Sequence, residues 1–416
     1  MNSTKNSIKK LLFMCIAYNS SMHGMNLLQP AETLLRPPYD RHLNYHTNVF
    51  LEGGFGSKSF NQDGLTSSPL HIWQTEQDSI AMLKGFNPAS PIGSLSNRLN
   101  ANNDGIRGRF AVCGDLDVRC AAAFNTRFFF LDNWFVSIHL PAYHIRLKNV
   151  HFTDKTENNN DADARVKALL TDNFAANVRQ LGCLDVSDWS RSGVGDLALL
   201  LNWYRDFPQA KEVLKNARIN WRVGLSMPTG KRADLDKLFA LPFGYDGAYA
   251  VPFGLGLDVM LGCYLQTGLD VQLTHIFGAV GEYRIKTDTN QTELLLLQKT
   301  CAYKDYGLTQ RFNLYVEMNK FLKGFSCLVG YQYLKHGTDH LALRTNAFSD
   351  TIANTAESLK DWTAHHAIIN ASYDFAVHTW HKKHALPYVS LYARIPFNGK
   401  RFTGNRTIGC VIAVDF

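Results

Sequence analysis

The charged residues that could act on a solute lie in stretches where apolar and polar residues alternate. Alternation with a period of two is typical of β-strands, whose successive side chains point to opposite faces. One face would be apolar, and charges of both signs on the other could line a water-filled pore or pair across strands in a narrow lumen. The charges that we predict to face a lumen are Arg109, Asp115, Asp117, Arg119, Arg218, Arg222, Asp258, Asp270, Arg311, Glu317 and Arg394.

Other residue types that could do chemistry do not gather into a site. A hydrolase built on a barrel needs a serine and a histidine together, and nothing in the sequence places Ser226 beside His275. His378, His381 and His384 have a spacing that could gather a metal ion, but the adjacent lysines would repel it. We therefore predict no catalytic residue, no metal site and no cofactor, and expect that the protein is not an enzyme.

The elements that position the charges are predicted to be about 12 strands, with about 10 to 16 compatible with the pattern. Most reach the roughly 9–11 residues that a tilted strand needs to cross a bilayer. The predicted strands are 47–56, 107–130, 134–147, 193–205, 217–227, 249–263, 266–277, 307–319, 324–335, 362–376, 386–397 and 406–416. The sequence thus predicts an all-β fold, a closed antiparallel transmembrane β-barrel.

The connections between these strands alternate in length. Beginning with the first connection, long ones alternate with short ones, and only the last of the long series, 398–405, is short. Outer-membrane barrels have short periplasmic turns and long external loops. We therefore expect both termini on the periplasmic side. Two of the long connections, 161–180 and 292–304, contain clustered apolar residues that suggest helices.

The final strand predicts that the protein is targeted to a membrane. Ile412, Val414 and Phe416 share one parity at the end of the chain. A terminal aromatic strand with one apolar face resembles the assembly signal of bacterial outer-membrane barrels, so we expect these residues to be read by the barrel-assembly machinery. In a closed barrel this strand must also pair with the first one.

The N-terminus predicts a processed leader. Lys9 and Lys10 precede the apolar run 11–18, and small residues follow it, which is the layout of a secretory signal peptide. We assign 1–24 to the signal peptide, 25–46 to a periplasmic N-terminal segment and 47–416 to the barrel. One irregularity is expected in strand 134–147, where the apolar parity changes near Pro141 in the manner of a β-bulge.

Three consecutive stretches carry a family resemblance. Residues 193–197 read Gly-Val-Gly-Asp-Leu, residues 223–231 end in Met-Pro-Thr-Gly-Lys, and residues 253–257 read Phe-Gly-Leu-Gly-Leu. This order resembles the outer-membrane channels related to the meta-pathway phenol-degradation proteins and, more distantly, the long-chain fatty acid transporters. The resemblance covers about a sixth of the chain. It implies a channel for small hydrophobic compounds, sometimes closed by an N-terminal hatch, for which 25–46 is short.

The sequence therefore predicts a bacterial outer-membrane barrel of a Gram-negative cell, acting as a passive, porin-like channel for small molecules, hydrophobic ones among them. Its partners would be the lipid bilayer and the solute. Lys and Arg are spread along the chain without a dense block, so nucleic acid is not expected despite a net charge of +7. A structural or adhesive barrel that binds an external partner through its long loops is the alternative, and a barrel hydrolase is a third. The oligomeric state is left open.

Overall fold

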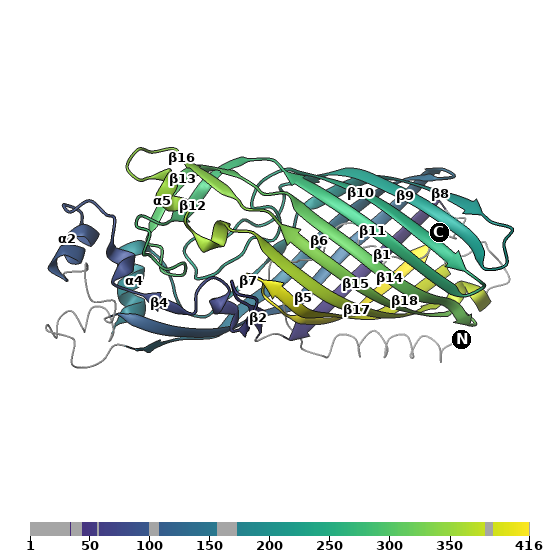
Figure 1. Ribbon diagram of the computed structural model, residues 1–416, viewed down its shortest axis with the longest axis horizontal. Helices are drawn as coiled ribbons and strands as arrows, with labels where there is room; N and C mark the ends of the chain where they lie inside the picture. The colour runs from purple at the N-terminus through teal and green to yellow at the C-terminus, as the bar shows by residue number, and fades with distance from the viewer. Residues whose placement is uncertain are drawn as a thin grey trace, which may run out of the picture.

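The computed structural model describes Leu34 and residues 44–55, 58–99, 108–155, 173–378 and 386–415. Antiparallel strands dominate it, and twelve of them form the wall of a barrel (Figure 1). These are β1 (Tyr45–Phe55), β5 (Arg109–Leu131), β6 (Trp134–Asp154), β8 (Leu197–Pro208), β9 (Leu214–Met227), β10 (Ala250–Leu261), β11 (Leu265–Ile276), β14 (Thr309–Leu322), β15 (Phe325–His336), β17 (Trp362–Asp374), β18 (Leu386–Lys400) and β19 (Arg406–Asp415).

The barrel is closed. The hydrogen-bonded order runs from β5 through β1, β19, β18, β17, β15, β14, β11, β10, β9 and β8 to β6, which pairs with β5 again. The last strand meets the first in register, with Val414 opposite Thr47 and Ile412 opposite Val49. The predicted closed antiparallel barrel is confirmed, and each of the twelve predicted strands overlaps one of these. Phe416 and the predicted signal peptide lie outside the described residues, so the targeting role of the terminal strand stays a prediction.

The two ends of the barrel differ as the loop lengths predict. At one end short turns join the strands, such as 132–133 between β5 and β6 and 323–324 between β14 and β15. At the other end the described parts of 58–108, 155–196, 228–249, 277–308 and 337–361 fold together into a structure that we call the cap. Among the described residues, no helix is long and apolar enough to cross a membrane.

The cap contains short elements of its own at the end opposite the turns (Figure 1). A three-stranded sheet, β12-β13-β16, lies beside short helices, and β4 and β7 pair with extensions of β5 and β6 beyond the barrel. The elements are β2 (Ser59–Phe60), β3 (Thr66–Ser67), η1 (Pro69–His71), β4 (Glu76–Asp78), η2 (Ala81–Leu83), α2 (Pro91–Arg98), α4 (Phe174–Gly182), β7 (Trp189–Val194), β12 (Ala279–Ile285), β13 (Gln298–Asp305), β16 (His340–Leu343), α5 (Asp350–Ala353) and η5 (Glu357–Leu359). At the turn end, η6 (Phe375–His378) follows β17.

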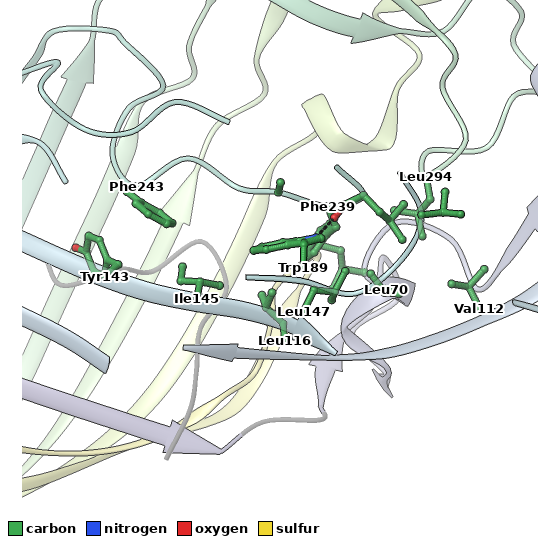
Figure 2. Packing of buried hydrophobic residues seen from close by; sticks show 14 of the residues in the cluster. Leu70, Val112, Leu116, Tyr143, Ile145, Leu147, Trp189, Phe239, Phe243 and Leu294 are labelled. Carbon is green, nitrogen blue, oxygen red and sulfur yellow. Dashed lines mark hydrogen bonds between the residues drawn. The ribbon is translucent and has the colours of Figure 1, made fainter. Parts of the chain in front are cut away.

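The cap has a hydrophobic core. Figure 2 shows that Leu116 of β5 and Leu147 of β6 pack with Trp189 of β7 and with Phe239 and Leu294 from two cap loops. All five side chains are at most 7% exposed. Removing this much apolar area from water stabilises a fixed arrangement of the loops. The cap is therefore a packed structure and not a set of independent loops.

Two local predictions are wrong. β6 alternates without interruption from Phe135 to Leu147, so Pro141 marks no bulge in its own strand. The irregularity lies in the segment that pairs with β6. Gly195, between β7 and β8, donates its amide to the Pro141 carbonyl. Apolar residues change parity because the inner face of β6 meets polar groups within the membrane and the apolar core of the cap above it. The second error is the helix expected in 292–304, which is a buried loop followed by β13; α4, by contrast, lies in the other predicted segment.

The outer wall of the barrel is apolar around its circumference. Large apolar side chains on alternate positions are exposed there, which in water would form an unsupported patch far larger than monomeric soluble proteins carry. These residues include Phe124, Phe128, Ile138, Leu140, Leu199, Ile219, Leu225, Phe253, Leu255, Leu257, Leu269, Leu273, Leu314, Val316, Val329, Ile369, Leu391 and Ile408. Their solvent is the hydrocarbon of a bilayer, and the strands cross it.

A charge on this wall is expected to destabilise the barrel in a lipid-dependent way. Leu255 is 50% exposed on β10, and Leu255→Arg should lower the free energy of unfolding in phospholipid vesicles by about 2–4 kcal/mol, as for arginine near a bilayer midplane. Val280 is equally exposed on the cap strand β12, and Val280→Arg should change it by less than about 0.5 kcal/mol. Equal effects of the two changes in denaturant titrations would contradict a lipid-facing wall.

Candidate functional site in the barrel lumen and the cavity above it

Polar side chains from neighbouring strands meet inside the barrel. Arg222 of β9 donates both terminal guanidinium nitrogens to Asp270 of β11, at 2.7 and 2.8 Å, and its Nε to Gln272 at 3.1 Å. Arg311 of β14 donates to the same Gln272 oxygen at 2.7 Å, and Asn313 donates to Asp270 at 3.3 Å. These five residues, which we call the lumen network, are at most 4% exposed. The bidentate geometry offsets part of the cost of burying both charges.

Glycines on β10 make this network possible. Gly254 lies in register between Arg222 and Gln272, so the arginine has to cross β10 to reach β11. A Cβ atom on Gly254 would lie 2.6 Å from the guanidinium carbon of Arg222. Gly256 gives the same room to Asn220, whose amide nitrogen would lie 2.6 Å from a Cβ there. The close approach that glycines on a strand indicate is made here by side chains.

The rest of the inner wall carries further buried pairs. Tyr392 of β18 donates to Glu52 of β1 at 2.7 Å, and Arg394 lies 3.4 Å from the same carboxylate. Tyr315 of β14 donates to Asp258 of β10 at 2.5 Å. Charges of both signs are thus neutralised within the lumen.

One residue that precedes the first strand lies inside the barrel. Leu34 is 1% exposed, and its carbonyl accepts a hydrogen bond from the Asn370 amide at 3.4 Å. A Cβ atom built on the inward-facing Gly330 would be 3.0 Å from Leu34 Cδ1. The leucine side chain therefore rests on the inner surface of β15 and reduces the free cross-section of the lumen.

A cavity of about 400 Å³ lies between the barrel and the cap. Gln272 and Arg311 of the lumen network line it together with Ser226, and the cap contributes apolar side chains such as Leu238 and Phe243. This volume is within the range of pockets that hold small molecules, and apolar walls with a few fixed polar groups are typical of them. The cavity is thus lined largely by apolar side chains on the cap side and by polar side chains of the lumen network on the barrel side.

Asp196 holds one wall of this cavity, the segment 229–246. Its carboxylate accepts the Gly230 amide at 2.8 Å and the Tyr245 amide at 2.6 Å, one at each end of the segment. A Cβ atom on Gly244 would lie 2.1 Å from the same carboxylate. Burial raises the pKa of Asp196, and the two amides oppose this shift. Two of the three stretches that carry the family resemblance, 193–197 and 223–231, therefore contact each other at the outer end of the barrel.

The same wall is fixed along its length. Trp189 donates its indole N–H to the Leu238 carbonyl at 2.6 Å, and Arg191 donates to the carbonyls of Ala240 and Leu241 at 3.2 and 2.7 Å. The Arg191 guanidinium also lies 5.2 Å from the ring centre of Phe243. Because side chains satisfy these loop carbonyls, the cavity is preformed.

A second polar cluster lines the cavity at the outer end of β15. His336 Nε2 lies 2.8 Å from Asp339 and its Nδ1 lies 2.8 Å from the Thr309 hydroxyl. Lys304 lies 2.9 Å from the other oxygen of Asp339. Burial opposes the charge of Asp339, but Lys304 and His336 outweigh it and lower its pKa from 3.8 to about 2.

The structure separates the residues predicted to face the lumen into three groups. Arg222, Asp258, Asp270, Arg311 and Arg394 point inward and are at most 4% exposed.

Arg218 and Glu317 lie on the same inner faces but near the turn end, where both are half-buried and Arg218 contacts Asp206 at 2.8 Å.

Arg109, Asp115, Asp117 and Arg119 are not in the lumen.

These four residues lie on the β5 extension, which continues past the membrane. There the inward positions are occupied by Phe110, Val112 and Leu116, which belong to the core of the cap. Asp117 pairs instead with Arg146 at 3.3 Å and Lys148 at 2.6 Å on the outward face. The prediction assumed that the apolar face always meets lipid, and this assumption fails where a strand leaves the bilayer.

Several site residues were missed because only charged residues were considered. Gln272, Asn313 and Tyr315 share the inward parity with Asp270 and Arg311, so the alternating pattern contained them. Glu52 was also missed, although its position in the predicted first strand could have indicated that it faces the lumen.

The residues of the cap cavity carried no such signal. They come from loops whose packing depends on contacts distant in sequence.

The structure does not support the serine–histidine pair. Ser226 is buried on the inner face of β9, whereas His275 is exposed on the outer face of β11. His381 and His384 lie outside the described residues. Within the described residues no group of three or more His, Cys, Asp or Glu side chains could hold a metal ion.

Comparisons with known proteins agree with the barrel fold. No family model and no curated protein matches the chain. The COG4313 outer membrane channel from Pseudomonas putida F1 is similar in structure, with a TM-score of 0.51 and 12% identity, over 94% of this chain and all of that one. The match shows a shared fold.

Two further barrels are less similar. The CymD monoaromatic hydrocarbon channel has a TM-score of 0.32 and 10% identity, over 90% of this chain and 89% of that one. A Pseudomonas aeruginosa FadL homologue has a TM-score of 0.31 and 7% identity, over 95% and 98%. Neither is similar enough to support an argument.

The lumen network predicts a large cost for removing one charge. Asp270→Asn leaves the buried Arg222 without its carboxylate and should lower the free energy of unfolding by about 3–5 kcal/mol. Asp206→Asn removes the partner of Arg218 at the half-exposed turn end and should cost about 0–1 kcal/mol. Denaturant unfolding of the two variants in the same vesicles measures this. Similar losses would contradict a buried, mutually dependent network.

The low pKa of Asp339 predicts a pH-dependent contribution to the stability of the cap. A carboxyl with a lowered folded-state pKa stabilises the fold above its unfolded value of about 4, and this is lost as pH falls through about 2. Asp339→Asn should therefore speed amide exchange in 337–361 at pH 6, and the difference from wild type should shrink toward pH 2. Asp305→Asn, an exposed change on β13, should have little effect at either pH. A difference that persists undiminished at pH 2 would refute the role of ionised Asp339.

Proposed function

We propose that this chain is a bacterial outer-membrane channel through which small molecules, hydrophobic ones among them, pass passively. The observation that carries the proposal is the preformed cavity of about 400 Å³, whose cap walls are largely apolar and whose barrel side is lined by residues of the lumen network. The name of the similar Pseudomonas putida protein, an outer membrane channel, supports it. The apolar outer wall supports a membrane location.

The lumen favours uncharged or amphipathic solutes over simple ions. Arg222 is neutralised by Asp270, and Arg394 lies against Glu52, so fixed charges of the two signs cancel within the wall. A free ion would exchange its hydration shell for a lumen without a dominant field. A small apolar molecule would instead contact residues such as Phe243 and Leu238 and replace water that these side chains bind poorly.

Leu34 is proposed to limit passage. Its side chain lies on the inner wall, at the level of Gly330 and Asn370. A solute that leaves the cavity for the turn end has to pass it or displace it. This residue lies in the predicted periplasmic segment 25–46, so that segment, although short, contributes to the lumen.

The hydrolase alternative is less well supported. Thr309, His336 and Asp339 form a hydroxyl–imidazole–carboxylate chain, which is the arrangement that a hydrolase would require. Lys304 and the Gly307 amide also bind Asp339, however, so the carboxylate fixes the cap to the barrel rim. We therefore infer a structural role and propose that the protein is not an enzyme. An adhesive role would rest on the well-packed cap, which could present a constant outer surface to a partner.

Recording from planar bilayers tests passage. The purified wild type should give a small, steady conductance, and Leu34→Ala should raise it several-fold because a buried side chain leaves the lumen. Leu65→Ala makes the same change at a site that is 66% exposed in the cap and should leave the conductance unchanged. A barrel that is silent in wild type and in both variants, and that does not admit small aromatic solutes into vesicles, would refute the channel and favour the adhesive role.

A further inference from the structure

Four cations form a band on the outer surface of the barrel, on the side formed by β19, β1, β5 and β6. Arg119 of β5 and Arg406 of β19 are exposed, and Arg146 and Lys148 follow each other on the outward face of β6. We call Arg119, Arg146, Lys148 and Arg406 the basic band. Arg119 was predicted to face the lumen, and the other three were not singled out from the sequence. Passage of a solute through the lumen gives none of the four a role.

The height of the band coincides with the edge of the bilayer. On β6 the outward residues run from Trp134 at the turn end through Ile138 and Leu140 to His144 and Arg146. Ten residues of a strand tilted by about 40° rise about 25 Å, which is the height of the apolar belt of outer-membrane barrels. His144 and Arg146 therefore lie where the outer-leaflet headgroups begin.

The acidic residues nearby neutralise the band only in part. Arg146 and Lys148 share one carboxylate, that of Asp117, at 3.3 and 2.6 Å. Asp115 accepts a hydrogen bond from the Asn149 side chain at 2.8 Å, and Asp188 accepts the backbone amides of residues 149 and 150.

Arg119 and Arg406 have no carboxylate partner among the described residues.

The opposite side of the barrel differs at the same level. There Tyr249, Phe277 and Tyr303 are 38–52% exposed near the outer ends of β10 and β11. Such rings are typical of the interfacial girdle, which needs no specific lipid. This side thus presents aromatic rings where the basic band presents cations.

We propose that the basic band binds the anionic phosphate groups of outer-leaflet lipids. Arginine side chains form paired hydrogen bonds with phosphate, and each Lys or Arg near an anionic membrane surface contributes about 1 kcal/mol. Arg119 and Arg406 supply guanidinium groups without a carboxylate partner in the described part of the chain, and Arg146 and Lys148 leave one positive charge beyond Asp117. The apolar residues below the band, such as Phe124 and Leu140, would contact the acyl chains of the same lipid. The proposal rests on the membrane location given above but not on solute passage.

Lipid retention tests the proposal. The full chain is equilibrated in detergent with equal amounts of phosphatidylglycerol and phosphatidylcholine, re-isolated, and its bound lipid is quantified by mass spectrometry. Wild type should retain phosphatidylglycerol preferentially. Replacing any one cation of the band by glutamine should lower this preference by about fivefold, the factor that corresponds to about 1 kcal/mol. The quadruple variant R119Q/R146Q/K148Q/R406Q should retain both lipids equally.

A matched variant and a salt titration keep the test decisive. R98Q/K155Q/R179Q/R344Q removes four cations from the cap and should keep the wild-type preference. If the quadruple band variant fails to fold, the four single band variants compared with the cap variant decide, and 0.5 M salt should abolish the wild-type preference if it is due to headgroup charge. No preference in wild type, an equal loss in the cap variant, or no effect of salt would each overturn the proposal. Retained preference in a protein without conductance would refute the channel and leave this inference standing.

Discussion

The structure depends on one constraint, that every backbone amide and carbonyl inside hydrocarbon must find a partner within the protein. A sheet satisfies this only when it has no edge, so β19 has to meet β1 and β5 has to meet β6. The ten-residue register between β1 and β19 is the seam where this happens. Closure in turn fixes which side chains point inward, because side chains alternate along each paired strand. The register between paired strands therefore determines that the residues of the lumen network point inward.

Closure also creates a problem inside the barrel, where polar groups are removed from bulk water. Arg222 illustrates the solution: it crosses a glycine on β10 to reach both Asp270 and Gln272, so one guanidinium satisfies acceptors on a strand two positions away. A side chain at Gly254 would block this path. Because the partners lie on different strands, the network also ties together the part of the wall from β9 to β14. In the channel that we propose, a lumen built in this way would select by shape and fixed hydrogen bonds more than by net charge.

Much of the fold could be predicted from the sequence because the bilayer imposes a simple pattern. Within the membrane, as on β11, an apolar residue faces lipid and the next faces the lumen, and Asp270 was placed correctly in space by that rule alone. The rule fails on β5 above the membrane, where Leu116 turns into the core of the cap and Asp117 turns to the outside. The cap cavity was beyond prediction for a different reason. Asp196 and Tyr245 are brought together by packing between loops, and no periodicity in the sequence reports such a contact.

The same reversal of faces sets the order of surfaces along the route that we propose from the cap into the lumen. On the inner face of β6, Ser137 and His139 within the membrane give way to Tyr143 and Ile145 above it, without any break in the strand. A solute entering from outside would meet apolar surface first and polar groups afterwards, along a single continuous wall. Apolar contacts favour entry of a hydrophobic molecule by removing its surface from water, whereas the polar groups below bind it weakly. Apolar surface followed by polar surface would allow a solute to be both captured and released, which passive passage requires. This order follows from the height at which the bilayer ends along the strands.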